Sequence, residues 1–263
     1  MVPVLPLDLS RDGHVHTSWC RHAVGTMEEY VLAALERGLT GLMFLEHFEA
    51  GINAPRRTWL TSEDFARYRE EGRRLRRLYA GRIEIGLGVE VGYNPRELEA
   101  TKKFLAVNSW DQIGISCHFL EIAGRHYNLL SSDRQTLAVF DAYGIEKALG
   151  AYFKLLAEAV ELLPGNVLCH LDAALRHHPG IAPALSAQSS TSALDRIFQV
   201  MAAKGTALEV NTSGFIHHRR QAYPSSDLLA RAAVHRLPLC LGSDAHQPKE
   251  VGRFFGPMAD LYP

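Results

Sequence analysis

The sequence has few cysteines, and none of them lies in a paired spacing. Of the 263 residues only four are cysteine, at positions 20, 117, 169 and 240. Disulfide frameworks and zinc knuckles need closely spaced cysteines, so the chain belongs to neither class. Cys117 and Cys169 each precede a histidine in an apolar run, and neighbouring side chains of a strand point to opposite faces. We therefore expect these two thiols to face the packed core while the histidines face a site.

The chain also lacks a long apolar run and a strong net charge. The formal net charge is -1, with 22% charged residues, which gives no reason to expect nucleic acid or an anionic membrane as a partner. The longest apolar runs, such as residues 237–242, are far too short to span a bilayer. The first residues do not resemble a secretory leader. The expectation is a cytoplasmic protein.

Familiar nucleophile and phosphate motifs are missing as well. There is no Gly-x-Ser-x-Gly elbow, no Cys-x5-Arg phosphatase loop and no Gly-x4-Gly-Lys phosphate loop. Chemistry that depends on an activated serine or cysteine is therefore not indicated.

Short apolar runs alternate with amphipathic stretches along the chain. The runs cover residues 4–9, 41–45, 83–91, 112–117, 167–169, 207–210 and 237–241. Helical stretches lie at 27–38, from 61 onward, at 145–163, 192–203 and 226–235, the first two with capping residues Thr26 and Thr61. Strands that alternate with helices predict a parallel α/β sheet. With no linker in between, residues 1–263 are predicted to form one closed or nearly closed β/α barrel domain, with an open doubly wound sheet as the alternative.

Two other segments have simpler interpretations. Residues 182–192 are rich in Ala and Ser, which we interpret as a surface loop. The basic stretch 67–77 is interpreted as the solvated face of a helix, because Glu70 and Glu71 provide local ion pairs.

Histidine is abundant, with 13 residues. Several apolar runs end in metal-binding residue types, and the ends of barrel strands meet at one mouth. His-x-His in extended chain places both imidazoles on one side. A single zinc needs about three or four protein ligands, so a larger set predicts two or three metals. The nine candidate ligands are His14, His16, His22, His47, Glu90, His118, His170, Asp244 and His246. The other histidines (126, 177, 178, 217, 218 and 235) are expected in loops or helices without a ligand role.

These motifs resemble the PHP (polymerase and histidinol phosphatase) superfamily, and within it the monofunctional histidinol-phosphatase branch. The metal motifs identify the superfamily, and Asn211-Thr-Ser-Gly followed by Tyr223-Pro-Ser points to the branch. The resemblance spans almost the whole chain, through Asp-Gly-His14-Val-His16-Thr, Cys20-Arg-His22, Glu46-His47, Gly-Val-Glu90-Val, Ser-Cys-His118-Phe-Leu, His170 and Gly-Ser-Asp244-Ala-His246-Gln. Arg21 stands where the family often has proline before the histidine.

The resemblance implies a distorted seven-stranded (β/α)7 TIM-like barrel with three divalent metals, which are zinc, iron or manganese. By position, the first metal would have His14, His16, Glu90 and Asp244. Glu90 would bridge to a second with His118 and His170, and His22, His47 and His246 would hold the third. The implied reaction is hydrolysis of L-histidinol phosphate by metal-activated hydroxide, with Glu90, Asp244 and His246 as catalytic residues. Arg176 and Arg219 are candidates for binding the phosphate.

Three alternatives stay open from the residues alone. The chain could act on another phosphate ester, such as a nucleotide. An amidohydrolase-type barrel uses similar ligands for C–N hydrolysis, although its usual signature lacks the group of His22 and His246. A non-catalytic metal-binding module is the third alternative.

Overall fold

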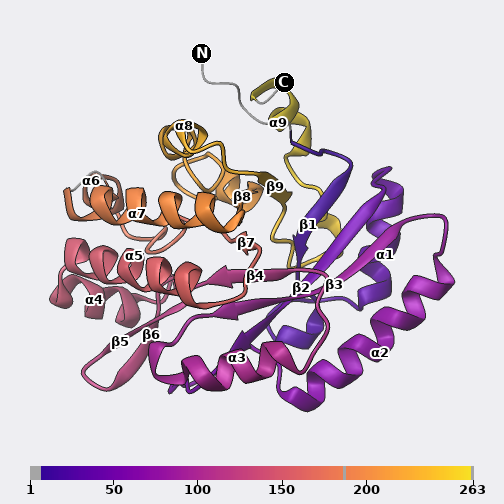
Figure 1. Cartoon of the computed structure of the whole chain (residues 1–263), viewed down its shortest axis with the longest axis horizontal. Coiled ribbons are helices and arrows are strands. Elements are labelled where there is room, and N and C mark those ends of the chain that lie inside the picture. The colour runs from indigo at the N-terminus through magenta and orange to yellow at the C-terminus, as the bar shows by residue number, and fades with distance from the viewer. Residues whose placement is uncertain (1–6, 186–187, 262–263) are drawn as a thin grey trace.

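The computed structural model describes residues 7–185 and 188–261, and a seven-stranded parallel sheet forms its centre (Figure 1). The strands stand in chain order: β1 (Arg11–Val15), β2 (Gly41–Glu49), β3 (Glu84–Gly92), β4 (Ile113–Ser116), β7 (Val167–Leu168), β8 (Ala207–Asn211) and β9 (Leu239–Gly242).

The two edges of this sheet meet. The backbone N–H of His16 donates to the carbonyl of Ala245 at 2.9 Å, and the N–H of Asp244 donates to the carbonyl of His14 at 2.9 Å. The sheet is therefore a nearly closed, seven-stranded barrel, as predicted. The open doubly wound alternative is wrong, because its edge strands would lie far apart.

Helices cover the outside of the barrel (Figure 1). The capping boxes predicted at Thr26 and Thr61 both form, with Glu29 and Asp64. The hydroxyl of Tyr68 donates to the carbonyl oxygens of Phe44 and Gly88 and so ties its helix to β2 and β3. Among the described residues no helix is both long and apolar enough to cross a bilayer. The helices are α1 (Met27–Glu36), α2 (Ser62–Leu78), α3 (Leu98–Ala106), α4 (Arg134–Tyr143), α5 (Ile145–Leu162), α6 (Ile181–Leu185), α7 (Gln188–Lys204), α8 (Ser226–Val234) and α9 (Phe255–Leu261).

A small apolar cluster fills part of the barrel interior. Leu45, Val167 and Cys169 are buried there and pack against Met43, Ala207 and Cys240. Leu45 precedes His47 on β2, and Val167 lies on β7, which ends before His170. The cluster therefore lies below the polar side chains, and the polar side chains occupy the carboxyl end of the strands.

An antiparallel hairpin was not predicted. β5 (Phe119–Ile122) pairs with β6 (Arg125–Asn128) directly after His118. Ala123 and Gly124 take positive φ angles of 52° and 78° in the tight turn. His126, expected in a loop or helix, lies on β6. The turn uses Ala-Gly rather than the Asn-Gly or Asp-Gly that signals a hairpin most strongly.

Two local predictions are wrong. Strand β1 begins at Arg11, whereas the apolar run predicted it at 4–9; residues 4–6 lie outside the described residues. The side chain of Asp8 accepts from the N–H of Ser10 at 3.0 Å, so a turn occupies this position. Residues 182–192, interpreted as a loop, fall largely in α6 and α7. Alanine is the strongest helix former, and the buried hydroxyl of Ser190 donates to the carbonyl of Ala184 at 3.1 Å.

Candidate metal centre

All nine candidate ligands meet at the carboxyl end of the barrel strands. His14 lies on β1 and His16 directly follows it, while His47 and Glu90 face each other in register on β2 and β3. The others follow β4, β7 and β9 or, for His22, the short helix at Ser18–Cys20. A cavity of about 330 Å³ opens among them, and six of the nine contribute to its lining: His22, His47, His118, His170, Asp244 and His246.

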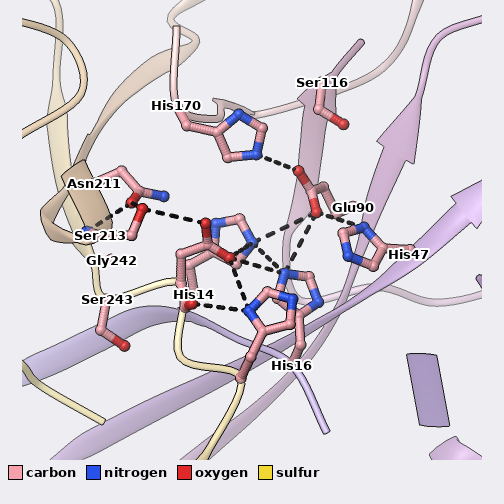
Figure 2. A network of polar contacts seen from close by, with 12 residues as sticks. His14, His16, His47, Glu90, Ser116, His170, Asn211, Ser213, Gly242 and Ser243 are labelled. Carbon is pink, nitrogen blue, oxygen red and sulfur yellow. Dashed lines mark hydrogen bonds and ion pairs between the residues drawn. The ribbon is translucent and has the colours of Figure 1, made fainter. Parts of the chain in front are cut away.

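Glu90 is the centre of the cluster (Figure 2). Its Oε1 lies 2.7 Å from Nε2 of His170 and 3.1 Å from Nε2 of His118. Its Oε2 lies 2.8 Å from Nδ1 of His47, and 3.5 and 3.6 Å from Nε2 of His16 and His14. Burial alone would raise the pKa of this carboxyl, but the surrounding histidines hold it well below its usual range. One fully buried carboxylate thus touches five imidazoles, which suits a bridging ligand.

Asp244 lies on the other side of the His14–His16 pair. Its Oδ1 is 3.4 Å from Nε2 of His16 and 3.9 Å from Nε2 of His14. Asp244 has φ 51° and His170 has φ 27°, which are backbone conformations that cost energy in residues other than glycine. Strained backbone thus occurs at two of the candidate ligands.

His22 and His246 provide the clearest test of whether a cation fits. The Nδ1 atoms of both rings lie 3.0 Å from backbone carbonyl oxygens, those of Cys20 and Asp244. Carbonyl oxygens only accept, so each Nδ1 carries a proton, and in the neutral form of each ring Nε2 then has a lone pair. Burial lowers the pKa of His22 to about 3, with further contributions from His47 and His246, so the ring is neutral near pH 7.

The two Nε2 atoms nevertheless stand 2.9 Å apart. Two lone pairs at this separation repel, and a cation between them removes the repulsion. Nitrogens this close can both reach one ion at zinc–nitrogen distances of about 2.0–2.1 Å.

Several other buried nitrogen and oxygen atoms of the cluster lie close to one another, yet none of them has a partner with hydrogen-bond geometry among the described residues. They include Oε2 of Glu90, Nε2 of His118, Nδ1 of His47 and Nδ1 of His16. Unpartnered buried polar atoms are costly and rare, whereas imidazole nitrogens and carboxylate oxygens are the usual ligands of divalent transition metals. The residues present fit metal ions, and we conclude that this is a divalent-metal site.

Two buried carboxylates beside the cluster were missed by the sequence reasoning. Oε1 of Glu49 lies 2.6 Å from Nδ1 of His118, and Oε1 of Glu209 lies 2.6 Å from Nδ1 of His14. Each is an acidic residue on a largely buried strand, Glu49 at the end of β2 and Glu209 within β8, and that pattern was the available signal. Glu46, part of the family motif, accepts from the backbone and hydroxyl of Thr17 instead.

The two candidate arginines lie at different places in the structure. Arg176 lines the metal cavity, and its Nε is buried without a partner among the described residues. Nη1 of Arg219 donates to Oδ2 of Asp172 at 2.7 Å, and Arg219 lines a different hollow beside α8. The lining of the metal cavity includes neither Arg219 nor the six histidines set aside above.

The two thiols expected in the core are both buried. Cys169 packs in the apolar cluster inside the barrel, as expected of a core thiol, but its Sγ lies on the same side as the site, within 4.8 Å of ligand atoms of His14 and Glu209. The alternation rule fails here since β7 ends at Leu168 and His170 turns into a left-handed conformation.

Comparison with known proteins gives a consistent picture. The PHP domain family model matches residues 12–213. A protein of Deinococcus radiodurans described as a "probable histidinol-phosphatase" is 33% identical over 244 residues, which cover 92% of this chain and 88% of that protein.

Two solved structures share the fold. A protein of Listeria monocytogenes, described as a "putative histidinol phosphatase", superposes with a TM-score of 0.85 at 22% identity, covering 94% of this chain and 99% of that one. The histidinol phosphate phosphatase of Lactococcus lactis, solved with zinc, L-histidinol and phosphate, has a TM-score of 0.77 at 21% identity, covering 96% and 92%. The match to the family model and the relative of Deinococcus radiodurans, together with the barrel and its cluster of candidate ligands, show that the chain belongs to the PHP family and, within it, to the histidinol-phosphatases.

Proposed function

We propose that this protein hydrolyses L-histidinol phosphate to L-histidinol and phosphate, the reaction of histidine biosynthesis. The observation that carries the proposal is the convergence of nine metal-binding side chains, six of which line, together with Arg176, one cavity of about 330 Å³. The description of the relative of Deinococcus radiodurans supports L-histidinol phosphate as the substrate. The L-histidinol and phosphate in the structure of the Lactococcus lactis protein support the same substrate.

We propose three divalent metal ions, which are zinc, iron or manganese. Glu90 would bridge the first ion, held with His14, His16 and Asp244, to the second, held with His118 and His170. The third would be held by His22, His47 and His246, and the facing Nε2 atoms of His22 and His246 support it. When bound, such ions stabilise charge on phosphoryl oxygens and lower the pKa of a water molecule at the site.

The protein's own side chains would divide the remaining work. Asp244 and His246 line the cavity and can contact the reacting group, whereas Glu90 is fully buried and acts through the metals. Arg176 is placed to donate charge-assisted hydrogen bonds to phosphate oxygens. Phe119 and Leu130 form an apolar wall beside the ligands. The proposed role of Arg219 is weaker, because Asp172 already pairs with its guanidinium.

Steady-state phosphate release tests the substrate. L-Histidinol phosphate is compared with a panel of nucleotides, sugar phosphates and an aryl phosphate, and its kcat/KM should exceed all others. Equal values across the panel would refute the narrow assignment and favour a general phosphomonoesterase.

His14→Ala and Asp244→Asn should abolish turnover with the fold retained, and turnover by metal-analysed His14→Ala protein would refute the metal mechanism. The expected cytoplasmic location is a separate prediction for cell fractionation.

A further inference from the structure

Glu209 lies inside the barrel on β8, directly beneath the metal centre, and is 1% exposed. Three nitrogen atoms surround its carboxylate. Oε1 is 2.6 Å from Nδ1 of His14. Oε2 accepts from the backbone N–H of His170 at 2.7 Å and from Nδ2 of Asn211 at 3.0 Å. The carboxylate is therefore the acceptor for groups on three different strands or strand ends.

The contact with His14 determines which ring nitrogen can bind a metal. In the neutral ring that a metal requires, a proton on Nδ1 facing this carboxylate leaves Nε2 with its lone pair. That Nε2 lies 2.8 Å from Nε2 of His16 and faces Glu90. Outer carboxylates that hold metal-binding histidines in this way fix both the tautomer and the ring orientation.

The contact with His170 acts on the backbone. His170 has a φ of 27°, a conformation that needs support from its surroundings. The hydrogen bond from its N–H to Glu209 supplies part of that support. Nε2 of the same residue then reaches Oε1 of Glu90 at 2.7 Å. One carboxylate thus holds a ligand on each side of the central Glu90.

Glycine on the neighbouring strand provides the space for this carboxylate. A Cβ at Gly242 would overlap Oε1 of Glu209 and stand 2.7 Å from Cβ of His14. The opposite wall repeats the arrangement: a Cβ at Gly92 would overlap the carboxylate of Glu49, the partner of His118. Because two outer carboxylates each rest on a glycine of the next strand, the space is built into the barrel at both places.

We propose that Glu209 is a positioning residue of the metal centre, which fixes the tautomer of His14 and the backbone of His170, and that Gly242 is required to seat it. Glu209 is not a ligand, although it lies near His14 and Cys169, because its oxygens are engaged with the three nitrogens. The inference rests on the metal centre of the proposed function but not on the identity of the substrate.

Glu209→Gln is the sharpest perturbation, because glutamine cannot satisfy all three contacts. If its oxygen faces His14, its NH2 group meets the N–H donors of His170 and Asn211. If the amide is reversed, the NH2 group donates to Nδ1 of His14 and moves the ring proton to Nε2, where it blocks the metal. We expect metal binding to weaken about 10- to 100-fold, measured by competition with a chromophoric chelator for zinc.

Leu208→Ala is the matched control, since Leu208 is fully buried on the same strand and contacts no ligand through a polar group. It should lower the melting temperature and leave zinc affinity unchanged, whereas Glu209→Gln should lower the affinity beyond any effect on stability. A purely structural role for Glu209 predicts that Glu209→Gln behaves like Leu208→Ala, with a lower melting temperature and unchanged zinc affinity.

Gly242→Ala keeps every ligand and the carboxylate, and it tests the same claim if Glu209→Gln does not fold. It should weaken zinc binding, while Gly150→Ala on α5, where a Cβ meets nothing within 4 Å, should not. Wild-type protein that binds no zinc would refute the metal centre itself. Wild-type protein that binds zinc, with Glu209→Gln and Gly242→Ala binding it equally tightly, would overturn only the positioning role.

Discussion

Removal of the metals should destabilise the barrel as a whole. The ligands come from β1, β2 and β3 and from the ends of β4, β7 and β9, so each ion joins strands that the unfolded chain does not hold together. Without the ions, Oε2 of Glu90 and Nε2 of His118 are buried without a hydrogen bond among the described residues. The Nε2 atoms of His22 and His246 also face each other at 2.9 Å.

The thermodynamic linkage between metal binding and folding gives the size of the shift in melting temperature. A ligand that binds only the folded state adds about 4.1 kcal/mol to the free energy of unfolding when its free concentration is about 1,000 times its Kd. For chains of roughly 150–250 residues, 1 kcal/mol shifts the melting temperature by about 2–4 °C. Each saturated site should therefore contribute roughly 8–16 °C.

Thermal unfolding followed by circular dichroism measures this shift. Metal-loaded protein is compared with protein stripped by prolonged dialysis against a chelator, and added metal should restore the melting temperature. The variant His22→Ala, which lacks one of the paired nitrogens, should lose less on chelation than the wild type. Stripped protein, shown metal-free by elemental analysis, that melts at the same temperature as loaded protein would refute the reasoning.

Four further predictions test the roles of individual side chains. Arg176→Ala should lower kcat/KM roughly 10- to 100-fold, because each hydrogen bond to a charged group contributes about 1.5–3 kcal/mol, while a melting curve should show little change. Arg219→Ala should instead lower the free energy of unfolding by about 3–5 kcal/mol, since it leaves the carboxylate of Asp172 buried and unpaired; an unchanged urea midpoint would contradict this. Burial, with help from the charge of Arg176 and His177, lowers the pKa of His217 to about 4, so the unfolded chain binds more protons between pH 6.5 and 4 and stability falls as the pH falls. His217→Gln should make that decline shallower in a pH series of melting temperatures, and an identical slope would argue against it. Burial raises the pKa of all four thiols, so a disulfide reagent should modify none of them in native protein at pH 8 and all of them after unfolding.

The barrel and the convergence of the candidate ligands could be predicted because their signals are local. A parallel strand ends at a definite residue, and the polar residues that follow it meet at one mouth, so His47, Glu90 and Asp244 could be placed together without knowing the packing. The six histidines away from these strand ends were set aside by the same reasoning, and none of them lines the metal cavity in the described part of the chain, although His126 lies on a strand. The start of β1 and the segment 182–192 were wrong because hydrogen bonds of short polar side chains and helix propensity outweighed composition. The hairpin that carries His126 was missed because its turn lacks the usual Asn-Gly or Asp-Gly signal.

Contacts between distant strands could not be predicted. Glu209 and His14 are 195 positions apart, and nothing in either segment names the other as its partner. The space at Gly242 depends on strand register, which places Asn211 beside Gly242. The ion pair of Arg219 with Asp172 likewise depends on how the segment before α8 folds back over the barrel. These features follow from three-dimensional packing and have no signature in the linear pattern.

The ratio of metal to protein tests the central claim most directly. Elemental analysis of wild-type protein purified without chelators should give three divalent ions per chain, and His22→Ala should lose one of them while keeping the pair bridged by Glu90. Protein that is folded and active on L-histidinol phosphate but carries no metal would contradict the account.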